Sequence, residues 1–104
     1  MIKGWGELEA RDQFGYTAFL WACYQGSTEC MQLLADAGCD TAATSKSGKT
    51  ALMLAAAEGG LKTCELLLKY GAERGFKDRW GHTAEQEAVF HQHTGPLLEL
   101  LKQP

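Results

Sequence analysis

The stretch S-K-S-G-K-T-A-L-M-L-A-A-A-E-G-G-L-K-T-C-E-L-L-L-K-Y-G-A-E, from Ser45 to Glu73, decides the fold of this 104-residue chain. Behind a turn that contains Gly48, it holds two short segments with helical apolar spacing, and a glycine ends each of them. The hydroxyl of Thr50 can accept a hydrogen bond from a free N–H of the first helical turn. The stretch therefore predicts a turn followed by helices at 51–58 and 61–70.

The same pattern occurs again 33 residues earlier and 33 residues later. A period of this length is typical of a stack of supersecondary units, in which each unit packs on its neighbours. We therefore expect an all-α repeat fold, a solenoid of helix-turn-helix units with short β-turn fingers. The positions that recur at this spacing include Gly15, Gly48 and Gly81; Thr17, Thr50 and Thr83; Ala18, Ala51 and Ala84; and Leu34, Leu67 and Leu100.

The period predicts one domain of two full units, 12–44 and 45–77, and a degenerate C-terminal capping unit, 78–104. In the first unit we expect helices at 18–25 and 28–37, the second with a buried face of Cys30, Met31, Leu33 and Leu34. Pro96 is expected to open the last helix. Gln86 and Glu87 replace apolar residues in the third unit, as expected where an outer face meets water.

Residues 1–11 fit the register of the end of a preceding unit. Two interpretations stay open. The chain is cut from a longer array, or Ile2, Trp5 and Leu8 fold back as a cap over the first helix pair.

These patterns resemble ankyrin repeats, through the core G-K-T-A-L-M-L-A-A of 48–56 and the closing L-L-K-Y-G-A-E of 67–73. The resemblance spans residues 7–102 and implies a general binding scaffold. The chain has no Asn, and it departs from the family's T-P-L-H motif, so helix starts are expected to rely on threonine alone. The family's proline position holds Ala18, Ala51 and Ala84, and its histidine position holds Leu20, Met53 and Gln86.

Composition narrows the classes of function. The net charge of −3 does not favour nucleic-acid binding. No apolar run approaches the ~20 residues that span a bilayer, and the N-terminus lacks the apolar segment of a signal peptide. Because the four cysteines show no close pairing, we expect a reducing, intracellular location, in cytoplasm or nucleus. We also expect a monomer. Cys23, Cys30 and Cys64 are expected to be buried, and Cys39 to be the most reactive thiol.

Signals for chemistry are weak, and we expect no catalytic residue, cofactor or metal. The segment 45–50 ends like a phosphate-binding loop, but Ala43 stands where that loop needs glycine, and no strand precedes it. His91 and His93 are expected on different faces of a helix end, as a solvated cap. Nothing favours a nucleophile–base pair of Cys39 and His82.

The fingers and the groove beside the first helices carry aromatic and basic residues, the types enriched at binding hot spots. The fingers give a basic, aromatic front, and the second helices an acidic back. We expect a protein partner with an acidic and apolar surface. The alternatives are a structural segment or spacer of a longer ankyrin array attached to another domain, or a nucleotide binder or enzyme. The candidate binding residues are Phe14, Tyr16, Tyr24, Lys46, Lys49, Arg79, Trp80, His82, Phe90 and His91.

Overall fold

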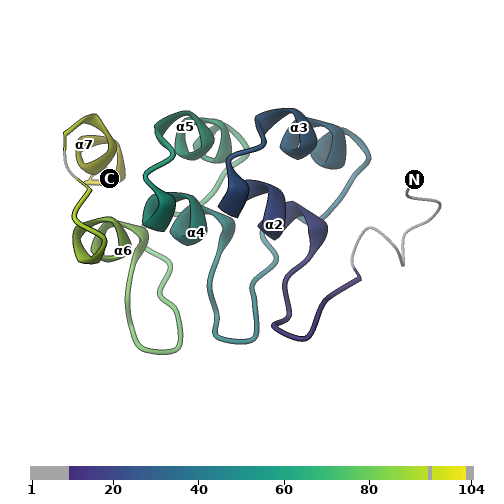
Figure 1. Cartoon of the computed structure of the whole chain (residues 1–104), viewed down its shortest axis with the longest axis horizontal. Helices are drawn as coiled ribbons and strands as arrows, with labels where there is room; N and C mark the ends of the chain where they lie inside the picture. Colours follow the sequence, from purple (N-terminus) through teal and green to yellow (C-terminus); the bar gives the residue numbers. More distant parts are fainter. Residues whose placement is uncertain (1–9, 94, 103–104) are drawn as a thin grey trace.

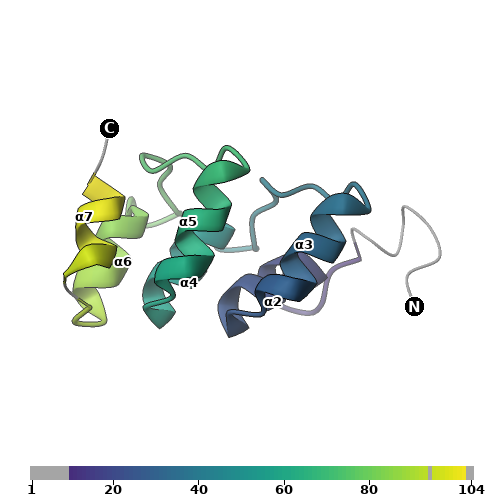
Figure 2. The same ribbon diagram turned by 90° about the horizontal axis from the view of Figure 1, so that it is seen from above.

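The computed structural model describes residues 10–93 and 95–102, in which three helix pairs lie side by side in two layers (Figure 1). Seen from above, the pairs follow one another along the long axis (Figure 2). The described residues measure 40 × 26 × 21 Å and contain no strand, so the predicted all-α repeat fold is confirmed. The first helices are α2 (Ala18–Gln25), α4 (Ala51–Glu58) and α6 (Ala84–Phe90), and the second are α3 (Thr28–Asp36), α5 (Leu61–Lys69) and α7 (Pro96–Lys102).

Local signals set the helix ends within one residue of the prediction. The hydroxyls of Thr17 and Thr50 accept hydrogen bonds from N–H groups in the first turns of α2 and α4. Gly26 and Gly59 end these helices with φ of 74° and 76°, a region that glycine enters without strain.

The third unit uses one more cap than expected. The Gln86 side chain accepts a hydrogen bond from the Thr83 N–H at 2.8 Å, while the Thr83 hydroxyl accepts from the Gln86 N–H. This reciprocal capping box satisfies two otherwise free donors. The expectation that every helix start relies on threonine alone is therefore wrong for α6.

The core lies in the seams between the units, as a stack requires. The helix α4 packs between α2 and α6. Phe19, Leu52 and Met53 are each about 1% exposed and belong to a buried cluster that includes residues from all three helix pairs. Each unit is therefore stabilised mainly by its neighbours, and not by a core of its own.

The predicted buried face of α3 is wrong in two positions. Met31 and Leu34 are buried, but Cys30 is exposed and Leu33 is 70% exposed. Cys30 shares its register position with Thr63, which is buried beside Gly26 and Gly60 where α5 faces the preceding unit. Within the described residues no helix pair precedes α3 to cover Cys30 and Leu33 in the same way.

The third unit departs from the register at its inner turn. Gln92 has a φ of 64° at the position that Gly26 and Gly59 hold in the first two units. The helix α7 begins at Pro96, two residues later in the repeat than α5, and its buried residues are Leu97 and Leu101. Leu100, expected to match Leu67, is only half-buried.

The predicted N-terminal cap of Ile2, Trp5 and Leu8 lies outside the described residues. None of the helices in the described ranges is both long and apolar enough to cross a membrane.

Candidate functional site

The three fingers are short turns that hydrogen-bond to one another. In the first finger, the Asp12 N–H donates to the Tyr16 carbonyl at 3.1 Å, and one oxygen of the Asp12 carboxylate accepts the N–H groups of Phe14 and Tyr16. Across the fingers, the Lys46 N–H donates to the Phe14 carbonyl and the Arg79 N–H to the Ser47 carbonyl. The fingers therefore form one connected edge of the stack.

Gly15 shows why the first finger needs glycine. Its φ is 80°, and a Cβ there would lie 2.7 Å from the Lys46 nitrogen and 2.8 Å from the Lys46 Cγ. The second finger can approach the first this closely only because Gly15 has no side chain.

The candidate aromatic residues gather at the two ends of one face. Phe14 and Trp80 share one register position and Tyr24 and Phe90 share another, so both pairs face the same way along the stack. The middle unit carries only a small side chain at each of these positions. Aromatic side chains therefore line a hollow at each end, and the middle unit between them has Ser47 and Ala57 at these positions.

The two hollows divide the candidate residues into two sets. The first-repeat hollow encloses about 450 Å³. The third-repeat hollow encloses about 850 Å³ beside α6 and the third finger. Phe14, Trp80 and Phe90 are 57%, 64% and 80% exposed, so none of them is a core residue. Phe14, Tyr16, Tyr24 and Lys46 line the first-repeat hollow, and Lys49, Trp80, His82 and Phe90 line the third-repeat hollow.

Arg79 and His91 line neither hollow. The Arg79 guanidinium donates to the Lys46 carbonyl at 3.4 Å, and the His91 Nε2 lies 3.8 Å from a Glu87 carboxylate oxygen. The rings of His91 and His93 stack with centroids 6.4 Å apart, contrary to the expectation of different faces. The reason is that α6 ends at Phe90, so residues 91–93 leave helical spacing, and the His93 ring lies 2.8 Å from the Ala57 carbonyl.

Lys49 is held by two carboxylates and is not an available positive charge. Its ammonium nitrogen lies 2.8 Å from Asp78 and also bonds to Glu87, with the Trp80 ring centroid 5.8 Å away. Burial opposes the ionisation of Asp78, but hydrogen bonds from Lys49 and from the N–H groups of His82 and Trp80 outweigh it and hold its pKa at about 2. Lys46 is exposed, so the basic front rests on residues such as Lys46 and not on Lys49.

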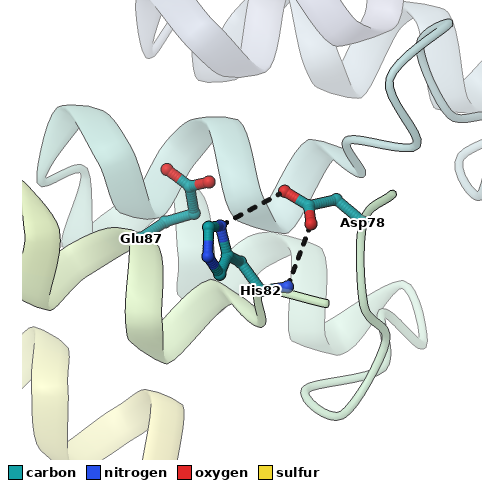
Figure 3. A group of neighbouring side chains, drawn as sticks. All are labelled: Asp78, His82 and Glu87. Atoms are coloured by element: carbon teal, nitrogen blue, oxygen red, sulfur yellow. Dashed lines mark hydrogen bonds and ion pairs between the residues drawn. The ribbon is translucent and has the colours of Figure 1, made fainter. Parts of the chain in front are cut away.

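Asp78, His82 and Glu87 form the metal-ligand grouping of the described residues, with donor atoms within 4.8 Å of one another (Figure 3). The dashed lines of Figure 3 join Asp78 to the ring and to the backbone nitrogen of His82. The Lys49 ammonium already bonds to both carboxylates, so a metal ion would have to displace it. The chemistry of the cluster is therefore that of a structural ion-pair network.

The segment 45–50 forms the second finger. A phosphate-binding loop must offer free backbone N–H groups. Here the N–H groups of Lys46, Gly48 and Lys49 donate to Phe14 and Ser45 within the protein. The geometry therefore gives no support to the nucleotide interpretation.

Two residues of this face, Trp21 and Glu87, were not among the candidates predicted from the sequence. Trp21 lines the first-repeat hollow, and its indole N–H donates to Asp12 at 2.6 Å. Glu87, expected only as a solvated outer residue, reaches back to Lys49 instead. The register could have indicated Trp21, because it lies one helical turn before Tyr24 on the same face of α2.

Comparison with known proteins agrees with the fold. A family model for three copies of ankyrin repeats matches residues 2–78. A search of curated proteins finds no significant match.

Proposed function

Because the chain belongs to the ankyrin repeat family, whose repeats are generally protein-interaction modules, we propose that it binds a protein partner across the face that carries the two hollows. Proteins of this family are typically not enzymes. In this proposal the units are 12–44, 45–77 and 78–104, and the partner lies across all three.

The observation that carries the proposal is the exposure of large aromatic side chains on one face. Phe14, Trp80 and Phe90 are more than half exposed and recur at two register positions. Leaving so much apolar surface in water is costly unless a partner covers it. Buried aromatic anchors at the centre of an interface carry most of its binding energy.

The charges on this face suggest how the partner approaches. Lys46, Lys77 and Arg79 are exposed on or beside the fingers, while Lys49 is neutralised within the fold. Rim charges of this kind raise the association rate of a partner with acidic groups, more than they raise affinity. The partner is therefore a protein that offers apolar side chains to the hollows and acidic groups to the fingers, inside the cell.

Binding kinetics of a partner recovered with this chain test the proposal. Truncating an exposed anchor with Trp80→Ala should weaken binding by about 2 kcal/mol and mainly speed dissociation. Lys46→Glu combined with Arg79→Glu should slow association and reduce its dependence on salt.

The matched controls are Glu65→Lys and Glu99→Lys on the second helices, which should leave both rates unchanged. A partner that tolerates the three front substitutions and is lost with the two back substitutions would place recognition on the opposite surface. The proposed face would then be rejected.

A further inference from the structure

Four aromatic rings of the first unit form a continuous row along the first-repeat hollow. The ring centroids of Phe14 and Tyr16 lie 6.4 Å apart, those of Tyr16 and Trp21 5.0 Å, and those of Trp21 and Tyr24 5.8 Å. The planes of successive rings are inclined to each other by 60° to 83°, so the rings do not stack face to face. They remain partly exposed as walls of one concavity.

The row has one carboxylate beside it, that of Asp12, and one ammonium group at its rim, that of Lys46. The Trp21 indole N–H donates to Asp12 at 2.6 Å, so this donor is not available to an anion. The Asp12 carboxylate stays ionised, because burial is outweighed by hydrogen bonds from Tyr16, Trp21 and Phe14, which leave its pKa below the ordinary value.

The charges that act on the Tyr16 phenol are of both signs. Lys49 acts most strongly among them, and the carboxylates of Asp12 and Glu87 act in the opposite sense. Because Lys49 is itself bonded to Glu87 and Asp78, its charge is offset locally. Lys46 is the cation at the rim, where its side chain starts against Gly15.

We propose that the first-repeat hollow is a binding site for a weakly hydrated organic cation, the methylated ammonium group of a modified lysine on the protein partner. A cation over an aromatic face is attracted by the ring quadrupole, and clustered rings recognise quaternary ammonium groups in this way. Methyl groups also lower the cost of removing the charge from water and fill space between the rings. This inference rests on the proposed function and names one chemical feature of its partner.

The test uses the whole chain and a small probe, so it needs no partner. Nα-acetyl-Nε-trimethyllysine methyl ester is titrated into ¹⁵N-labelled protein, and the indole N–H signals of Trp21 and Trp80 are followed. A neutral analogue, in which carbon replaces the quaternary nitrogen, has the same shape without the charge. The charged probe should shift the Trp21 signal and bind about five-fold more tightly than the neutral analogue, the ratio of an exposed cation–π contact.

Four variants test which residues of the first-repeat hollow bind the probe. Phe14→Leu and Tyr24→Leu should each weaken binding of the probe several-fold. Asp12→Asn should also weaken it, because the variant loses the negative charge and its NH2 group cannot accept from the Trp21 indole N–H, while its remaining oxygen can still accept the N–H groups of Phe14 and Tyr16. Lys46→Met should strengthen binding by removing the like charge at the rim. In every variant, unchanged signals elsewhere in the spectrum show that the fold is intact.

Phe90→Leu is the matched control, because Phe90 lies in the third-repeat hollow and should not matter for the probe. Equal binding of the neutral analogue, a shift at Trp80 in place of Trp21, or no shift overturns the inference. Probe binding tests only the cation site, where Lys46→Met should strengthen binding. The proposed function is tested by the partner, whose association should be slowed by Lys46→Glu with Arg79→Glu, so either proposal can fail while the other holds.

Discussion

Replacing Lys49 with methionine tests the ion-pair network that joins the second finger to the third unit. Breaking a buried ion pair costs about 3–5 kcal/mol, whereas an exposed pair contributes at most about 1 kcal/mol. The side chains of Lys49, Asp78 and Glu87 are 20%, 0% and 11% exposed, which places this network between the two cases. We expect Lys49→Met to lower the free energy of unfolding by about 2–3 kcal/mol in urea at neutral pH.

The pH dependence of that loss identifies its cause. The pKa of Asp78 is about 2, below the ordinary 3.8, so its contribution to stability is complete above about pH 4 and disappears as the pH falls towards 2. Without Lys49, the pKa of Asp78 should rise, because a main hydrogen bond to the carboxylate is gone. The gap in stability between wild type and variant should therefore narrow as the pH falls from about 4 towards 2.

Lys46→Met is the control, because Lys46 occupies the same finger with an exposed side chain. It should change stability by less than about 0.5 kcal/mol. If Lys49→Met unfolds at the same urea concentration as Lys46→Met, the ion pairs of Lys49 do not stabilise the fold. If the stability gap between wild type and Lys49→Met is unchanged at the lowest pH, the ionised Asp78 is not its cause.

Three further changes test the local structure. Gln92→Gly should raise the free energy of unfolding by about 0.5–1 kcal/mol in urea titrations, because glycine adopts the φ of 64° without strain, and a loss of stability would contradict this. Gly15→Ala should lower it by about 1–3 kcal/mol, whereas Gly75→Ala, which meets no atom within 4 Å, should be near neutral in the same assay. In thiol labelling followed by mass spectrometry, we expect exposed Cys30 to react first, in place of the half-buried Cys39 that the sequence indicated. Cys23 and Cys64 should react last, because burial raises the pKa of both thiols, that of Cys64 to about 12; early labelling of either would indicate that the seam opens.

The repeating part of this protein follows from its sequence. The period of 33 residues, the threonine before each first helix and the glycines that follow the helices of the first two units act within a few residues, so they predict these helices wherever the unit is placed. The same register predicted that Phe14 and Trp80 would stand on equivalent fingers, and both are exposed.

Only the tertiary structure decided which charges and apolar groups find partners in other units. Lys49 bonds to residues 29 and 38 positions away, and no local pattern shows that its charge is neutralised. The exposure of Cys30 likewise depends on what lies against α3, and the burial of Leu101 in place of Leu100 depends on how α7 packs on α5 and α6. The physical reason is that caps and turns are short-range interactions, whereas burial and ion pairing are set by the geometry between neighbouring units.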